Sequence, residues 1–395
     1  MENIRRVQLS EIAEFITKGT TPTTLGYEFQ EEGVNFLKIE CFDENGDFVE
    51  SKATHISNEC HERLKRSQLK SGDILFSIAG VIGRVASVTE DMLPANTNQA
   101  LAIIRISDEQ VYLPYVKLIL TSPIVIEQFE KKKQGVAQLN LSLKDISEFS
   151  IPLPSKKEQI ELAELFTKII NVISKRKDEL KALDDIIKAR FVEMFGDPIT
   201  NPKEWKMVEL GKLTTIGSSK RIFEKEYVSE GIPFYRTKEI VELSKGNSIS
   251  TELFITKERF FEIKDKYGVP KKGDLLVSAV GTIGVIWIVD GSNDFYFKDG
   301  NLIRVDASEK FDSVYMKNLL ENLIDDYKKQ MSTGTTYNAL TISGLTKLKV
   351  YDVPIELQNL FSEFVNQVYK SKVTVQKALE ETQILFDSLM QKYFG

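Results

Sequence analysis

Two long segments of the chain carry apolar residues that alternate three and four positions apart. The first segment covers residues 156–195, and eight of its ten seam positions are apolar: Leu162, Phe166, Ile169, Ile173, Arg176, Leu180, Leu183, Ile187, Arg190 and Met194. The second seam lies 199 positions later and is again mostly apolar: Phe361, Val365, Val368, Lys372, Val375, Leu379, Thr382, Phe386, Leu389 and Tyr393. Each pattern predicts a long helix with one narrow apolar seam.

The flanking residues mark the ends of the first helix. Pro152 and Pro154 precede it, and Gly196, Pro198 and Pro202 stop it. A narrow seam needs a partner to bury it, so we expect the two helices to pair antiparallel. The alternative is two unrelated amphipathic helices, each packed on its own domain.

The rest of the chain shows shorter patterns. Residues 73–78, 101–106 and 274–279 are strand-like apolar runs, whereas residues 112–133 and 313–330 have a helical pattern. This mixture predicts α+β domains. A predicted turn, Gly-x-x-Gly, occurs at Gly80 and again at Gly281; its middle residues are not basic, which argues against the phosphate-clamping loop of a KH domain.

The chain is two copies of one unit. Gly72-Asp73 and Gly273-Asp274 lie 201 positions apart, in step with Ser77 and Ser278. Further matched positions are Val7, Leu9 and Ile12 with Val208, Leu210 and Leu213; Ile104-Arg105-Ile106 with Ile303-Arg304-Val305; Gly135 with Gly334; Gln159 with Gln358; and Phe195-Gly196 with Phe394-Gly395. Such a period is too long for a solenoid repeat, so each copy is a domain plus a helix.

These patterns predict an α+β protein with two similar globular domains, separated by two long antiparallel helices that form a coiled coil, and with an internal pseudo-twofold repeat. The expected boundaries are residues 1–154 for the first domain, 155–196 for the first helix, 197–354 for the second domain and 355–395 for the second helix.

Composition narrows the class of protein. A net charge of −6 and a pI near 5.4 argue against indiscriminate coating of nucleic acid, although local basic faces remain compatible with them. The charged N-terminus and short apolar runs predict a cytoplasmic protein with no membrane partner. Cys41, His55, Cys60 and His61 lack the usual zinc-ligand spacing, so we expect ordinary thiols and no metal.

The motifs of common catalytic sites are absent. The sequence has no Walker loop, no Gly-x-Gly-x-x-Gly, no His-Glu-x-x-His and no Asn-Pro-Pro-aromatic motif; Asn201-Pro202-Lys203 comes nearest to the last. Both histidines lie in the first copy, which excludes a duplicated site built on histidine. We therefore expect no catalytic residues and no enzyme activity of the chain by itself.

The order of motifs resembles one family. GDILFSIAGVIG, IPLPSKKEQI, FGDP at 195–198 and NPKEW at 201–205, followed by a second copy, resemble the specificity subunit of type I restriction-modification systems. The second copy differs from the first in this order of motifs, because it has VYDVPIELQN in place of IPLPSKKEQI. The resemblance implies two target-recognition domains, each of which reads half of a bipartite site on double-stranded DNA.

The same resemblance implies the partners. The paired helices would set the spacer and dock two modification subunits, and restriction subunits would join the full complex. S-adenosylmethionine, ATP and magnesium would belong to those other subunits, so this chain is expected to bind no cofactor. Two other classes stay open: a coiled-coil adaptor that binds proteins, which a gel shift would distinguish, and an enzyme with an unrecognised motif, which methyltransferase activity of the purified chain would establish.

Polar loops that combine amide, hydroxyl and basic side chains are the candidates for reading DNA, because these groups suit base edges and phosphates. In the first copy they are Lys18, Thr20, Thr21, Lys38, Lys133, Gln134, Gln138 and Asn140. In the second they are Ser218, Ser219, Lys220, Arg221, Arg236, Lys238, Thr335, Thr336, Tyr337 and Asn338. Different residues at matched positions are what two different half-sites would require.

Overall fold

A computed structural model of the chain describes residues 5–43, 46–131, 140–331 and 339–395. The chain divides into two compact units. Unit 1 consists of residues 1–177 and 377–395, and unit 2 consists of residues 178–376. Each unit therefore contains one α+β domain and part of both long helices, which confirms the predicted fold class.

Unit 1 is built on a four-stranded antiparallel sheet, a three-stranded sheet and a two-stranded sheet. Their strand orders are β2 (Phe15–Lys18), β8 (Leu101–Arg105), β5 (Ile74–Ser77), β6 (Val85–Ser87); β4 (Thr54–Ile56), β3 (Val34–Leu37), β7 (Ala95–Thr97); and β1 (Arg6–Gln8), β9 (Ser150–Pro152). The central strand β5 is buried on both faces, which is why its sequence is continuously apolar rather than alternating.

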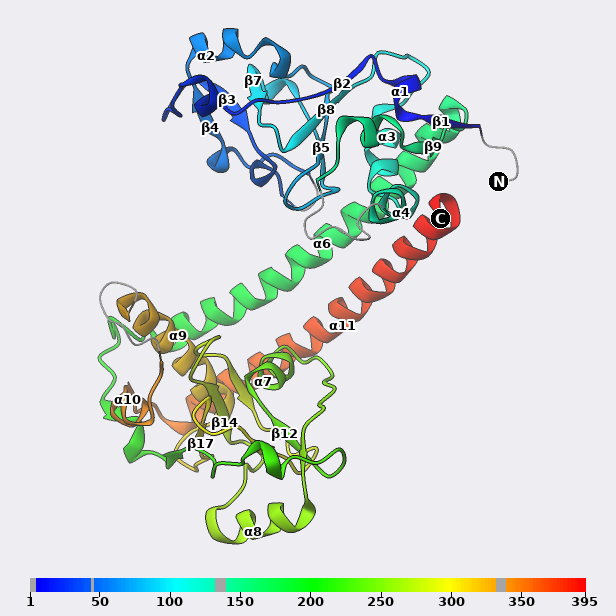
Figure 1. The fold of residues 1–395 in the computed structure, drawn as a ribbon. Coiled ribbons are helices and arrows are strands. Elements are labelled where there is room, and N and C mark those ends of the chain that lie inside the picture. The colour runs from blue at the N-terminus through cyan, green and yellow to red at the C-terminus, as the bar shows by residue number, and fades with distance from the viewer. Residues whose placement is uncertain (1–4, 44–45, 132–139, 332–338) are drawn as a thin grey trace. The chain divides into compact units, whose positions relative to one another are not determined.

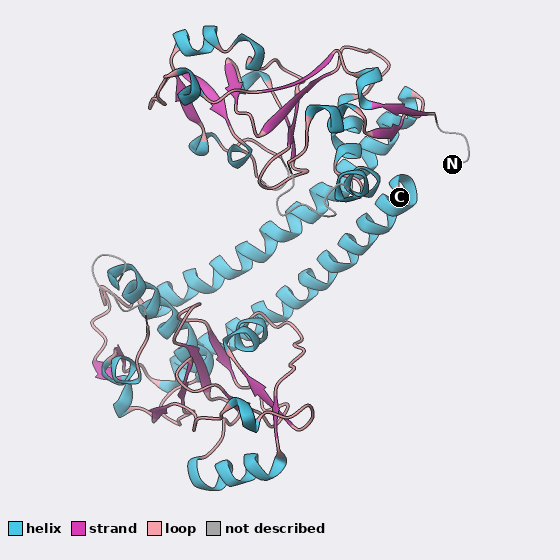
Figure 2. Cartoon of the chain, in the orientation of Figure 1, coloured by secondary structure: helices cyan, strands magenta, loops and turns pink. Residues whose placement is uncertain are grey.

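Unit 2 repeats this arrangement. Its sheets run β11 (Ile216–Gly217), β17 (Leu302–Val305), β14 (Leu275–Ser278), β15 (Ile286–Ile288); β13 (Phe254–Ile255), β12 (Ile232–Tyr235), β16 (Tyr296–Phe297); and β10 (Met207–Glu209), β18 (Lys349–Tyr351). Figure 2 shows these strands in the globular part of the unit, with α8 (Lys257–Tyr267) at its edge. The equivalent helix of unit 1, α2 (Asn58–Arg63), is shorter.

The repeated Gly-x-x-Gly is a tight turn between two neighbouring strands, as predicted. Gly83 has a φ of +89°, and a Cβ there would lie 3.0 Å from the ring of Phe129. Gly284 has a φ of +85°, and a Cβ would lie 2.6 Å from Ile324. The Ser77 hydroxyl closes the first turn by donating to the carbonyl oxygen of Val81 at 2.6 Å. Both glycines are therefore required by backbone conformation and by packing.

The predicted match between β8 of the first copy and β17 of the second is wrong by two positions. Ile104 lies opposite Ile74 in unit 1, whereas Val305 lies opposite Leu275 in unit 2. Ile104 therefore corresponds to Val305 and not to Ile303. Side chains in a strand repeat every two residues, so a shift of two keeps every apolar residue on its own face and the sequence pattern cannot reveal it.

The corrected register explains a difference between the two Gly-Asp motifs. The carboxylate of Asp73 pairs with the guanidinium of Arg105 at 2.6 Å, and the two side chains are 1% and 14% exposed. Asp274 instead accepts hydrogen bonds from the backbone nitrogens of Lys271 and Ala307, both at 2.8 Å. Burial raises the pKa of Asp274 above its usual range.

The helical pattern at residues 112–133 is two helices in the structure rather than one. They are α3 (Leu113–Leu120) and α4 (Pro123–Glu130). Pro123 has no backbone N–H and starts the second helix at its first turn, with Ser122 before it in extended conformation. Unit 2 has no proline here, and α9 (Ser313–Met331) is continuous as predicted. In unit 1, α3 and α4 lie beside the first part of α6 (Figure 1).

The two long helices are α6 (Lys156–Phe195) and α11 (Ile355–Phe394). All twenty predicted seam positions are buried or half-buried. In unit 1 the ring of Phe166 lies 5.6 Å from that of Phe386, and Arg176 hydrogen-bonds Thr382. In unit 2 the rings of Phe191 and Phe361 lie 5.5 Å apart.

Residue numbers fall along α11 as they rise along α6, so the helices pack antiparallel within each unit. This confirms the predicted pairing.

A buried glutamine joins each long helix to its domain. The side-chain oxygen of Gln159 accepts from the backbone nitrogen of Tyr112 at 2.9 Å, and its amide donates to the Pro154 carbonyl at 2.9 Å. Gln358 makes the matching bonds to the Asp312 nitrogen and the Val353 oxygen, at 2.9 and 2.8 Å. A polar residue buried to this degree must satisfy its hydrogen bonds, which explains why it recurs in both copies.

Candidate nucleic-acid interface

Each unit presents a group of polar loops where the strands of its two larger sheets end. We call the unit 1 group face 1 and define it by Lys18, Thr20, Thr21, Lys38 and Gln99. The unit 2 group is face 2, defined by Ser218, Lys220, Arg221, Arg236, Lys238, Lys298 and Asn301. The sheets are rigid and the loops carry exposed polar side chains, an arrangement typical of binding sites.

The end of β7 connects the loop at residues 18–21 of face 1 with the end of β3. The backbone nitrogen of Thr20 donates to the carbonyl oxygen of Thr97 at 3.2 Å, and the hydroxyl of Thr97 donates to the Leu37 carbonyl at 2.7 Å. Thr21 hydrogen-bonds Gln99 through their side chains. The structure thus brings together the predicted loop at residues 18–21 and Lys38, which follows β3 directly.

Lys38 and Arg236 occupy equivalent positions after β3 and β12. The ammonium group of Lys38 lies 4.5 Å from the ring centroid of Phe29. Arg236 donates to the buried carboxylate of Glu239 at 3.1 Å, and Lys238 lies 3.6 Å from the same carboxylate. Arg236 and Lys238, two of the four predicted basic residues of face 2, are therefore oriented by one acidic side chain.

The loop at residues 218–223 of face 2 is anchored at several points. The hydroxyl of Ser218 donates to the Leu302 carbonyl at 3.2 Å, and the backbone nitrogen of Lys220 donates to the hydroxyl of Tyr296 at 2.6 Å. Ile222, two residues after Lys220, is 2% exposed and packs in the core of the unit. Burial raises the pKa of Tyr296, so its hydroxyl stays neutral.

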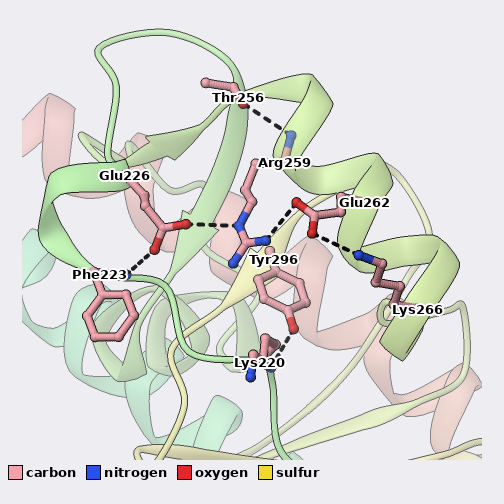
Figure 3. Close-up of polar contacts among 8 residues, drawn as sticks. All are labelled: Lys220, Phe223, Glu226, Thr256, Arg259, Glu262, Lys266 and Tyr296. Carbon is pink, nitrogen blue, oxygen red and sulfur yellow. Dashed lines mark hydrogen bonds and ion pairs between the residues drawn. The ribbon is translucent and has the colours of Figure 1, made fainter.

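An arginine on α8 fixes the far end of this loop. Figure 3 shows Arg259 between Glu226 and Glu262, at 2.9 and 2.8 Å, while the backbone nitrogen of Phe223 donates to Glu226 at 2.8 Å. The hydrogen bond to Glu262, with the negative charge of Glu226, raises the pKa of Arg259. The loop therefore has a fixed backbone although Lys220 and Arg221 are exposed.

Two hollows in face 2 share one wall residue, Asn301. Lys238 and Thr282 line the first hollow, and Arg221 and Lys298 line the second. The predicted segments at residues 218–221 and 236–238 are thereby brought to one continuous surface. Amide and basic side chains in a hollowed surface can bind base edges and phosphates.

One further predicted residue, Asn140, is described and is exposed. Outside the described residues lie Lys133, Gln134, Gln138, Thr335, Thr336, Tyr337 and Asn338. Their role in DNA reading stays a prediction.

Gln99, Lys298 and Asn301 belong to the two faces but are not among the residues predicted from the sequence. Asn301 and Ala100 are matched positions, because the backbone nitrogens of Ala279 and Ile78 donate to their carbonyl oxygens at 2.8 and 2.9 Å. The change from alanine to asparagine at a matched position was a signal that correct repeat register would have supplied.

The cysteines and histidines of unit 1 lie in different surroundings. Cys41 and Cys60 are buried in separate apolar clusters, and burial raises the pKa of both thiols. His61 hydrogen-bonds Asn96 at 2.5 Å. Over the described ranges, no three His, Cys, Asp or Glu side chains group so that they could hold a metal ion. None of the helices in the described part of the chain is long and apolar enough to span a membrane.

Comparison with known proteins identifies similar chains. The family model of the type I restriction modification DNA specificity domain matches twice, at residues 1–182 and 202–383. A Haemophilus influenzae protein described as a type I restriction enzyme specificity subunit is 30% identical over 57% of this chain and 57% of its own length. The EcoBI specificity subunit of Escherichia coli is 27% identical over 49% of this chain and 41% of its own length.

The matched regions therefore span about half the length of these two relatives. Among solved structures, a chain of a type I restriction-modification system aligns over 100% of this chain with a TM-score of 0.59 and 18% identity. At that identity the likeness concerns the fold alone.

Proposed function

Because this chain belongs to the type I restriction modification DNA specificity family, we propose that it is the DNA-recognition subunit of such a complex, with one half of a bipartite site read by each unit. The observation that carries this proposal is the pair of equivalent loop faces with different side chains. Ala100 is matched by Asn301, and Lys38 by Arg236. Equivalent scaffolds with different polar groups suit two half-sites of different sequence.

The partners follow from the long helices. Apolar side chains lie exposed on the outer sides of both helices in each unit. In unit 1 these are Leu165, Val172, Ile384 and Leu385; in unit 2 they are Ile186, Val192, Leu360, Tyr369 and Val373. Exposed apolar groups along a helix pair are suited to protein contacts, which supports docking of partner subunits on them. One modification subunit would dock on each unit, restriction subunits would complete the assembly, and the chemistry and its cofactors would belong to those subunits.

An exchange of one domain tests the proposal. Replacing residues 1–154 by the equivalent domain of a relative with another target should change one half of the methylated motif and leave the other half intact. The measurement is methylation mapping in cells that carry the chain and its modification subunit. The unexchanged chain is the control. A motif that changes in both halves, or a chain that directs no sequence-specific methylation, would contradict the proposal.

A further inference from the structure

One arginine of face 2 is held in a way that favours a base edge over a phosphate. The Nε of Arg221 donates to the Oδ2 of Asp299 at 2.7 Å, while the arginine side chain is 67% exposed and the aspartate 13% exposed. Because the ion pair uses Nε, the donors of the two terminal nitrogens remain for another acceptor. An arginine presented in this way has a fixed fork of parallel donors.

The backbone beneath this arginine is fixed as well. Lys220 is bonded to Tyr296, Ile222 is buried, and Phe223 is bonded to Glu226, which Arg259 holds from α8 (Figure 3). The equivalent place in unit 1 has Thr21 and Gln99 bonded to each other. A side chain that is already ordered loses less conformational entropy on binding. More of its interaction energy is then available to discriminate between bases.

The charge of the pair distinguishes the two possible acceptors. Arg221 and Asp299 together are neutral, so they attract a phosphate little and release few counterions. Asp299 would also repel a phosphate close to the arginine. A guanine edge carries two acceptors, O6 and N7, at the spacing of a guanidinium fork, and it carries no net charge. Lys298, next in the chain and lining the same hollow, is the residue suited to a phosphate.

The geometry points to Arg221 as the residue that reads a guanine in the half-site of unit 2, with Asp299 as the residue that positions it. This inference rests on the proposed function, since it assigns a base to one of the two faces. It predicts a G·C pair at a defined place in one half of the motif, and it predicts that the other half-site is independent of both residues.

The test uses the full chain assembled with its modification subunits and a randomised double-stranded DNA library, followed by sequencing of the bound fraction. Arg221→Lys keeps the charge and removes the fork, so the preference for guanine at one position should fall about tenfold to a hundredfold. The other half-site is the internal control for folding. Lys225→Ala, an exposed neighbour outside the hollow, should leave the motif unchanged.

Asp299→Asn separates positioning from plain stability. Removal of its negative charge should weaken the preference for guanine, yet tighten binding to DNA without the motif and steepen its salt dependence. A merely structural role would not lower the preference for guanine at one position while the rest of the motif and the other half-site stay unchanged.

The inference is overturned if the unit 2 half-site lacks a G·C pair, if Arg221→Lys keeps the same preference, or if it weakens binding to all sequences equally, as a phosphate contact would. A wild-type complex without any sequence preference would instead overturn the proposed function.

Discussion

The pairing of buried charges sets the two domains apart at the scale of single residues. Asp73 and Asp274 occupy equivalent turns in the two units, but only Asp73 is paired with an arginine among the residues that the structure describes. A buried carboxylate with two backbone donors, as at Asp274, tolerates loss of its charge better than one that neutralises a buried guanidinium. The two aspartates should therefore differ in their importance to stability.

We expect Asp73→Asn to destabilise the sheet of unit 1 by about 3 kcal/mol, since it removes the carboxylate that pairs with the largely buried guanidinium of Arg105. The measurement is hydrogen exchange of the amides in β5 and β8. Asp274→Asn is the matched variant in unit 2 and should reduce protection of β14 and β17 less. The double variant Asp73→Asn with Arg105→Met should recover much of the loss; a double variant as unstable as the single one would refute this explanation.

At the scale of elements, the long helices carry apolar residues on two different sides. Their seams are buried against each other, whereas exposed apolar residues face outwards. Val373 on α11 in unit 2 is 69% exposed, and Ile384 on α11 in unit 1 is 68% exposed. A seam of this width is enough for pairing, so the additional apolar residues are not needed for the helix pair itself.

Aspartate at either exposed position should prevent docking of one modification subunit, because a charge would be desolvated in the interface. We expect Val373→Asp or Ile384→Asp to reduce the number of bound modification subunits from two to one, and the double variant to bind none. Light scattering of the purified complexes gives the mass. Thr374→Asp is the control, since Thr374 is an exposed polar neighbour. Full assembly of the double variant would show that the subunits dock elsewhere.

At the scale of the whole molecule, both long helices pass through both units: α6 continues from unit 1 into unit 2, and α11 runs in the reverse order. If each unit reads one half-site, the length of these helices is expected to set the number of unread base pairs between the halves. An α-helix rises about 1.5 Å and turns about 100° per residue, which makes the expectation quantitative.

We expect four residues inserted in each helix, near Lys177 and Gln376, to give a functional complex whose motif has one or two more unread base pairs. Four residues add about 6 Å and about 40° beyond a full turn, and one or two base pairs add about 3 to 7 Å with a right-handed turn of about 36 to 72°.

Seven residues are the control. Seven added residues keep the heptad pattern and turn the far end of each helix by only about 20°. The three base pairs that match the added length turn the DNA by more than about 100°, so the second half-site would face away from its unit and binding should be poor. Methylation-sensitive sequencing measures the spacer. A functional four-residue variant with an unchanged spacer would refute the role of the helices.

Features that depend on short-range periodicity could be predicted from the amino-acid sequence. The seams predicted α6, α11 and their pairing, because a repeat of three and four residues fits one face of a helix and nothing else. The matched glycines predicted both turns, because their backbone conformation has few alternatives. The duplication could be recognised in the sequence because both copies keep the same apolar seam and the same turn glycines.

Features that depend on contacts between distant segments became visible in the folded chain alone. The strand register, with Ile104 opposite Ile74, was hidden because a shift of two preserves the apolar pattern. The assembly of face 2 was hidden as well: Arg221 meets Asp299 and adjoins Asn301 across nearly eighty residues of chain, and no local pattern marks residues that a sheet edge brings together. Local constraints are encoded in spacing, whereas a binding surface is encoded in the fold that gathers it.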